Sequence, residues 1–161
     1  MKTILSIFSV CMILFLSVNT ADAQKFGVAA GLGYGTEFET GSLNAGILYS
    51  INDDIRSSVD FFYFFPKNDV TWMELNANGH YGFIENEKMF FYGLAGVNYI
   101  IVSIKGAGTA ISNSNETGFN VGVGLDYQLG GIGVYAETKY VINKIMLNNQ
   151  IMANAGVRFF F

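Results

Sequence analysis

The sequence contains little cysteine, proline or histidine, with one residue of each among its 161. The one cysteine, Cys11, lies inside an apolar run near the N-terminus, so the rest of the chain cannot form a disulfide or a cysteine-based metal or redox site. A thiol-free mature chain suits export through an oxidising compartment. The single proline, Pro66, and 19 glycines disfavour long helices and are typical of many strands joined by turns.

Charge is also scarce, at 14% of residues, and the net charge of −4 provides no basic surface for nucleic acid. Hydrophobic residues make up 51% of the chain and aromatic residues 16%. Beyond the N-terminal run, no apolar stretch is long enough for a membrane-spanning helix. The apolar residues must therefore be buried, or face lipid, in some other way.

The first 23 residues predict a cleaved signal peptide, with a basic start at Lys2, an apolar run over 4–18 and a small-residue site over 21–23. An uncleaved anchor is the alternative, but the run of about 15 residues is shorter than the ~20 that a spanning helix needs. Cys11 lies within the run rather than at the cleavage point, which argues against lipidation. Residues 24–161 then form one domain.

The remaining chain repeats one pattern eight times: apolar side chains alternate with polar or glycine residues, as on a strand with two different faces. Aromatic residues lie near the ends of the apolar faces. The fifth segment is apolar on both faces, and only Asn98 sets its phase, which turns Phe91, Ala95, Val97 and Tyr99 outward. The expected strands are 25–35, 42–51, 56–65, 70–83, 89–103, 118–129, 132–142 and 150–161.

The connections between these segments alternate in length. Short turns are expected at 52–54, 84–88 and 130–131, and longer loops at 36–41, 66–69, 104–117 and 143–149. A sheet that spans a bilayer must close on itself, because the hydrocarbon core offers no hydrogen-bond partner to backbone N–H and C=O groups. The pattern therefore predicts an all-β, eight-stranded, antiparallel up-and-down transmembrane barrel, with both termini on the side of the short turns.

The C-terminus ends on a strand with no polar tail, and it carries a polar residue, a glycine and two aromatic residues at fixed spacing. These are Asn154, Gly156, Phe159 and Phe161. The motif resembles the assembly signal of bacterial outer-membrane barrels, and residues 24–161 resemble the small OmpX-like and OmpW-like, porin-family barrels of Gram-negative bacteria. The resemblance implies a monomer in outer-membrane lipid, both termini in the periplasm, and contact with the barrel-assembly machinery during biogenesis.

A soluble lipocalin-like barrel is the rival fold, but it needs an apolar interior. Here the inner face carries too many charged or titratable side chains: Arg56, Asp60, Glu74, His80, Asp126, Glu137, Lys139 and Arg158. Such a lumen is an ion path or, where the charges pair, a plug, and we expect the plug. Arg158 is expected to reach Glu137 diagonally, and Asp60 to face Glu74 across one hairpin. These two carboxylates either hold a cation between them, which we expect, or share a proton.

No motif indicates a catalytic residue, a cofactor or a metal site. Some small outer-membrane barrels modify lipid A with a serine and a histidine, and His80 is the only histidine available. It falls on the inner face toward a short turn, which is the wrong face and depth for outer-leaflet lipid. The sequence therefore predicts a non-enzymatic protein with a structural or surface-interaction role. A passive channel for small or hydrophobic solutes is the alternative, and a lipid A-modifying enzyme is a remote one.

Overall fold

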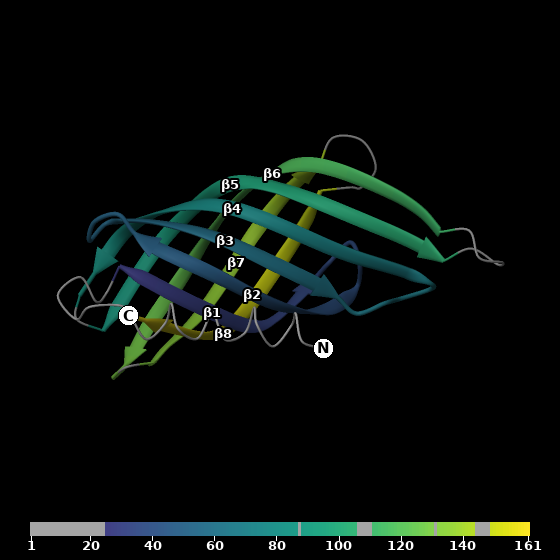
Figure 1. Ribbon diagram of the computed structural model, residues 1–161. Coiled ribbons are helices and arrows are strands. Elements are labelled where there is room, and N and C mark those ends of the chain that lie inside the picture. Colours follow the sequence, from purple (N-terminus) through teal and green to yellow (C-terminus); the bar gives the residue numbers. More distant parts are fainter. Residues whose placement is uncertain (1–24, 87, 106–110, 131, 144–148) are drawn as a thin grey trace, which may run out of the picture.

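The computed structural model describes residues 25–86, 88–105, 111–130, 132–143 and 149–161, and the predicted signal peptide lies outside these ranges. Eight strands form one closed barrel (Figure 1), so the predicted fold is confirmed. The strands are β1 (Phe26–Gly35), β2 (Thr40–Ser50), β3 (Ile55–Phe64), β4 (Val70–Glu85), β5 (Met89–Lys105), β6 (Ile111–Leu129), β7 (Ile132–Asn143) and β8 (Gln150–Phe160).

Closure comes from pairing β1 with β8, in antiparallel register from Gly27 opposite Phe160 to Gly35 opposite Met152. Each other strand pairs with the next strand along the chain. The start of β1 and the end of β8 therefore lie together, at the end of the barrel where β2 turns into β3, β4 into β5 and β6 into β7. We call this the turn end, and the opposite end the loop end.

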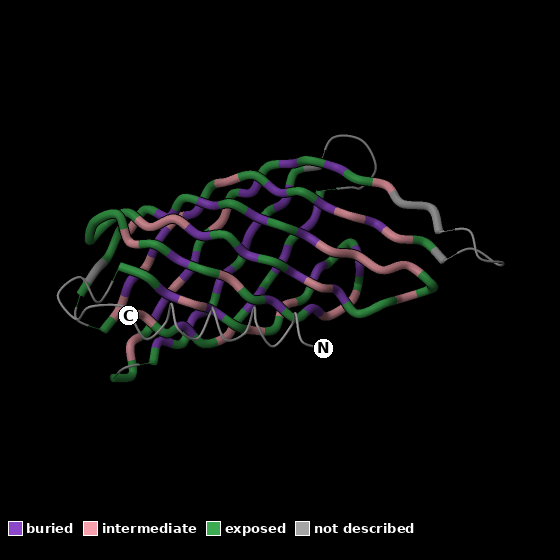
Figure 2. Tube along the Cα trace, viewed as in Figure 1, coloured by how far each residue is buried: buried purple, intermediate pink, exposed green. Residues whose placement is uncertain are grey.

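Burial alternates along every strand (Figure 2). In β6, Phe119, Val121 and Val123 point outward and are about half exposed, whereas Asn120 points inward and is buried. The phase expected for the fifth strand is correct, because Asn98 is buried and Tyr99 is exposed. An apolar surface thus surrounds a partly polar interior, the arrangement that a lipid environment requires. Among the described residues, no helix is long and apolar enough to cross a membrane.

Most strand boundaries lie within two residues of expectation, and the largest difference is in the hairpin of β5 and β6. The loop expected over 104–117 is wrong in its described part, because β5 continues to Lys105 and β6 begins at Ile111. The extra residues pair regularly, from Tyr99 opposite Thr117 to Lys105 opposite Ile111. The polar composition of residues 112–117 hides the start of β6 from sequence analysis, since a strand outside the membrane needs no apolar face. β4 also runs past the expected end to Glu85, across a bulge between Gly82 and Ile84.

Inward glycines make room for large side chains in this narrow barrel. A Cβ placed on Gly82 would lie 2.5 Å from the ring of Phe90, and one on Gly31 would lie 2.6 Å from the hydroxyl of Tyr135. A barrel of eight strands has an interior just wide enough for its own side chains. The glycines therefore decide which neighbouring strands can send a ring or a long side chain into the lumen.

Candidate functional site

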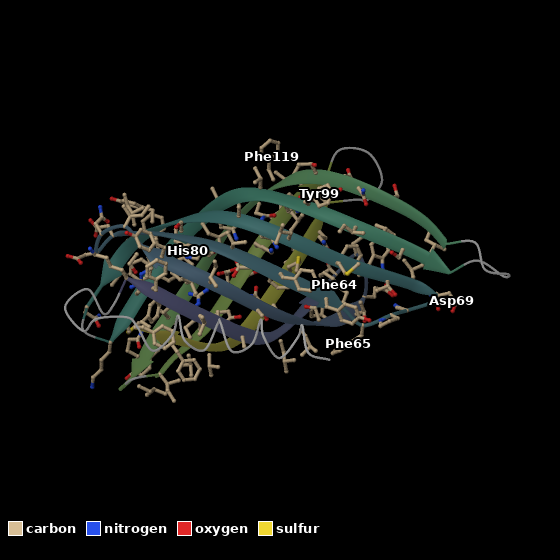
Figure 3. All side chains as sticks on the ribbon, in the orientation of Figure 1. Phe64, Phe65, Asp69, His80, Tyr99 and Phe119 are labelled. Atoms are coloured by element: carbon tan, nitrogen blue, oxygen red, sulfur yellow. The ribbon has the colours of Figure 1, made fainter. Side chains whose placement is uncertain are left out.

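Side chains fill the lumen in layers of different chemistry, and in Figure 3 His80 lies toward the turn end whereas Phe64 lies toward the loop end. Near the loop end is an apolar group that we call the aromatic plug, and toward the turn end is an ionic group that we call the charge cluster. The plug consists of Phe38, Phe62, Phe64, Val141 and Met152, with Trp72 against it. The cluster consists of Arg56, Tyr92, Asp126, Glu137 and Arg158.

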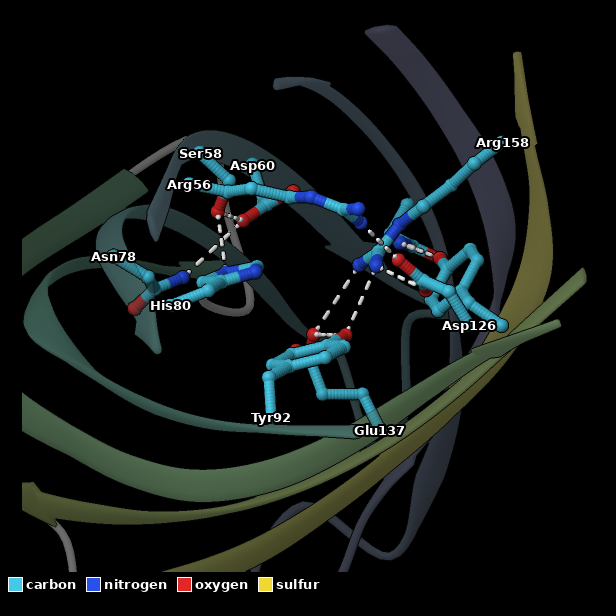
Figure 4. Close-up of polar contacts among 11 residues, drawn as sticks. Arg56, Ser58, Asp60, Asn78, His80, Tyr92, Asp126, Glu137 and Arg158 are labelled. Carbon is cyan, nitrogen blue, oxygen red and sulfur yellow. Dashed lines mark hydrogen bonds and ion pairs between the residues drawn. The ribbon is translucent and has the colours of Figure 1, made fainter. Parts of the chain in front are cut away.

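The charge cluster is centred on Arg158 of β8, whose guanidinium meets three partners (Figure 4). It donates to Asp126, to Glu137 at 3.3 Å and to the hydroxyl of Tyr92 at 2.9 Å. Tyr92 in turn donates to Glu137 at 2.9 Å, and Arg56 pairs with Asp126 at 3.0 Å. Two cations thus face two anions. Buried charges are tolerated when they are paired and hydrogen-bonded in this way.

Aromatic rings hold both guanidinium groups in place. The guanidinium carbon of Arg158 lies 4.1 Å from the ring centre of Tyr135, and that of Arg56 lies 3.6 Å from the ring centre of Phe90. At these distances a ring attracts the cation and excludes water from one face of it. The cluster therefore closes the lumen sterically as well as electrostatically, and it joins side chains from β3, β5, β6, β7 and β8.

His80 lies beside this cluster, with its ring stacked on Tyr92 at 4.6 Å between centres. Its Nε2 lies 3.2 Å from Oγ of Ser58, whose hydroxyl donates to Asp60 at 2.7 Å. The hydroxyl proton is therefore directed to the carboxylate rather than to the imidazole, and Nδ1 of His80 has no protein partner. A catalytic triad needs the opposite order, with the acid on the histidine and the histidine accepting from the serine.

A second ion pair crosses the lumen nearer the loop end. Lys139 of β7 donates to Glu74 of β4 at 3.1 Å, and the two side chains are 1% and 0% exposed. The ammonium also lies 4.4 Å from the ring centre of Phe62. A single lysine on a single carboxylate, with the second carboxylate oxygen left without a protein partner, is a sparser arrangement than the charge cluster.

The expected face-to-face pair of Asp60 and Glu74 is wrong, because Asp60 lies opposite Asn76, and Glu74 opposite Phe62. The turn explains the shift of two residues. Asn68 and Asp69, both with positive φ, form a two-residue turn inside the Lys67 to Val70 bridge, whereas a turn over all of 66–69 was expected. Asp60 instead accepts hydrogen bonds from Ser58 and Asn78.

Asparagines fill the layer between the two ion-pair systems. Asn120 donates to Asn76 at 2.6 Å and to Asn78 at 3.0 Å, and it accepts from Asn98 at 3.2 Å. The sequence predicts that these asparagines face the lumen, but it does not predict their hydrogen-bond partners. Sequence analysis missed the aromatic plug, because Phe62 and Phe64 lie on a face defined by its polar residues and Phe38 belongs to a loop. In the part of the chain that the structure describes, no group of three or more acidic, histidine or cysteine residues is placed to hold a metal.

No family model and no curated protein matches the chain. Solved structures do. The N-terminal β-barrel domain of Pseudomonas aeruginosa OprF superposes with a TM-score of 0.71 at 18% identity, covering 86% of this chain and 99% of that one. Neisserial surface protein A gives 0.67 at 22% identity, covering 84% and 97%. Ail, the attachment invasion locus protein of Yersinia pestis, gives 0.58 at 18% identity, covering 84% and 97%.

An enzyme shares the same architecture. The outer-membrane enzyme PagL superposes with a TM-score of 0.55 at 12% identity, covering 83% of this chain and 98% of that one. At such identities the likenesses report the fold and leave the activity open. Together with the closed sheet and its apolar outer surface, they show that this chain has the fold of the small eight-stranded bacterial outer-membrane β-barrels.

Proposed function

We propose that the protein is an integral outer-membrane barrel with a structural or surface-interaction role, and that it neither transports solutes nor catalyses a reaction. The observation that supports this proposal is that side chains close the lumen in two places. The charge cluster closes it toward the turn end, and the aromatic plug closes it at the loop end. A side-chain-filled barrel leaves its loop end as the surface available to partners. The exposed apolar surface supports residence in lipid.

The orientation we propose places the turn end, with both termini, in the periplasm and the loop end at the cell surface, as is usual for outer-membrane barrels with short periplasmic turns. An epitope inserted between Asn68 and Asp69 should be detected by antibody on intact cells. The same epitope between Asp53 and Asp54, at the turn end, should be detected only after permeabilisation. Detection of the second epitope on intact cells would reverse the orientation.

Assembly is the proposed role of the C-terminal motif. Phe159 points outward from β8, and Phe161 donates its backbone N–H to Phe26 at 2.7 Å. Outward aromatic residues at the end of the last strand remain accessible to assembly factors until the barrel closes. A glycine at position 156 is also needed structurally. Gly156 lies opposite Gly31 of β1, and a Cβ placed on it would collide with the β1 backbone. A closed sheet also leaves no unpaired edge in lipid, which supports a monomer.

An enzymatic role is not favoured, because Ser58, His80 and Asp60 are all buried in the lumen with their hydrogen bonds in the non-catalytic order. The channel alternative is tested by planar-bilayer recording of the refolded protein. We expect no unitary conductance steps from preparations in which heat-modifiable mobility verifies folding. Reproducible steps carried by the folded fraction would refute the plugged lumen and favour passive transport.

A further inference from the structure

The outer wall of the barrel is recessed over β7 and β8, which lie side by side (Figure 1). Two small side chains on each strand point outward there, and they lie opposite one another in the strand register. These are Ala136 and Thr138 on β7, opposite Ala155 and Ala153 on β8. We call these four residues the small block. A groove with a volume of about 570 Å³ lies over them.

Larger side chains border the small block on both flanks and toward the turn end. Toward the turn end, the next outward pair is Val134 and Val157. The flanking side chains stand directly beside the small block in the register of the neighbouring strands. They are Leu125 and Val123 on β6, with Phe91 of β5 beside Leu125, and Leu32 and Tyr34 on β1. The recess therefore follows from side-chain size along two neighbouring strands, and the sheet beneath it is fully paired.

The groove continues along β7 toward the loop end. A second hollow of about 400 Å³ shares Val123 and Thr138 with the first, and it is lined farther on by Tyr140 and Ile151. From Ala136 to Tyr140 the strand rises about 13 Å, at about 3.3 Å per residue. The two hollows together are long enough to take an extended stretch of a hydrocarbon chain.

The floor of the groove presents methyl groups. Thr138 is the polar member of the small block, and its hydroxyl donates to the backbone carbonyl of Met152 at 3.2 Å. The small block also lies midway along β7 and β8, within the part of the wall that faces hydrocarbon. Depth and chemistry together select an apolar guest, because a polar guest would lose its hydrogen bonds to water there.

A lipid chain fits the groove better than a second copy of the barrel does. In a two-fold contact centred on this face, each small block would meet the other, and the two recesses would leave the space between them unfilled. An unfilled recess forfeits dispersion contacts. The exposed apolar surface on both flanks of the groove already faces lipid, so a chain can enter from the surrounding bilayer.

Two tyrosines flank the loop end of the groove. Tyr34 and Tyr140 both point outward, and their side chains are about half exposed. Tyrosines at the end of a lipid-facing surface place an apolar ring against the chains and a hydroxyl among the head groups. Their hydroxyls are donors for the carbonyl group from which an acyl chain starts.

We propose that the groove over β7 and β8 binds one acyl chain of a membrane lipid whose head group lies at the loop end, level with Tyr34 and Tyr140. The inference rests on the proposed function only in that it takes the outer wall to face lipid, and it is independent of whether the lumen conducts. A chain held in this way stays with the barrel while other lipids around it exchange.

Native mass spectrometry of the refolded protein in detergent micelles tests the site, with dimyristoyl phosphatidylcholine as the probe. Ala136→Leu with Ala155→Leu fills the groove and should raise the dissociation constant of the lipid by roughly tenfold, which is a loss of about 1.4 kcal/mol. The matched control is Ala77→Leu with Ala95→Leu, since these alanines also point outward on adjacent strands, β4 and β5. The control should retain lipid as the wild type does. Equal retention by the groove-filling variant and the wild type would overturn the proposal.

The same spectra separate a lipid from a second copy of the chain. Loss of a dimer, rather than of bound lipid, in the groove-filling variant would assign the groove to a second copy and overturn the proposal. Heat-modifiable mobility verifies that each variant is folded. If the double variant does not fold, Ala136→Val fills less of the groove and should weaken lipid retention in the same direction.

A photoreactive phosphatidylcholine with a diazirine in its chain locates the site. At one lipid per barrel, cross-links should concentrate in the peptides that contain the small block, and an even spread over the eight strands would overturn the proposal. Tyr34→Phe with Tyr140→Phe should weaken retention by roughly threefold, because two donors are lost. Unchanged retention in that variant would overturn the placement of the head group at the loop end.

The groove and the proposed function fail in different ways. A protein that does not refold in lipid vesicles would refute the residence in lipid on which the proposed function depends. A barrel that refolds there and retains no lipid in micelles refutes only the groove.

Discussion

The two ends of the lumen are closed by different means. Toward the turn end, Arg158 joins Asp126 and Glu137, and every member of that cluster is anchored in a strand. At the loop end, apolar rings close the lumen, and one of them, Phe38, stands on a connection between strands. A charge network inside a wall cannot open without leaving buried charges unpaired. A ring on a loop can leave while the barrel stays intact.

The largest effect is expected at the turn end. Arg158→Met would leave Asp126 and Glu137 buried with fewer partners, and should lower the free energy of unfolding by about 5 kcal/mol. Urea titrations in lipid vesicles measure it. Adding Asp126→Asn and Glu137→Gln to the same chain should recover much of the loss, since the stranded charges are removed. A midpoint unchanged in Arg158→Met would show that the cluster does not hold the barrel closed.

A smaller loss is expected from the sparser ion pair. Glu74→Gln would leave the buried ammonium of Lys139 with an amide in place of its carboxylate, at a cost of about 3 kcal/mol. The double variant Glu74→Gln with Lys139→Met should lie closer to wild type than the single variant does. If the urea midpoint of Glu74→Gln rises instead, Glu74 is under repulsion and the pairing described here is not what stabilises this layer.

A still smaller loss of stability is expected when the aromatic plug is disrupted. Phe38→Ala removes a ring that is packed on Trp72 and Phe64 but belongs to a loop, and we expect a loss of about 2 kcal/mol, below the range for a phenylalanine deep in a core. The same urea titration measures it. If Phe38→Ala lost as much unfolding free energy as Arg158→Met does, the two ends of the lumen would not differ in how firmly they are closed.

The smallest effect on stability is expected for the exposed ion pair between Lys67 and Glu39, which holds the same loop. Lys67 donates a hydrogen bond to the carboxylate of Glu39, and this bond and the charge of the ammonium lower the pKa of Glu39. The pair therefore contributes while Glu39 is ionised, and its contribution disappears as the pH falls through that lowered pKa. Lys67→Met should therefore shift the urea midpoint slightly at pH 7, and this shift should shrink as the pH falls through the lowered pKa of Glu39. A pH-independent shift would assign the effect to packing of the lysine stem.

The sequence predicts the barrel well because lipid imposes one simple demand on every strand. This holds even for β5, which is apolar on both faces, because Asn98 points inward and Tyr99 points outward. The interior follows no such rule. Phe62 and Phe64 share a face with Asp60, and the two positive-φ residues of one turn decide that Asp60 meets Asn76 rather than Glu74. Partners across a lumen depend on register, and one turn residue can change the register.

Strand length has a further consequence at the loop end. A tilted membrane strand needs about 9–11 residues, whereas β5 has 17 and β6 has 19. The surplus of roughly seven residues, at about 3.3 Å each, carries this hairpin some 20 Å farther along its strands. Among the described residues, those at 111–117 pair only with β5, since pairing with β7 starts at Gly118. Along one continuous strand, β6 thus passes from a stretch paired on both sides to one that, among the described residues, pairs on one side. Its backbone amides should exchange their hydrogens with water faster in the second stretch than in the first.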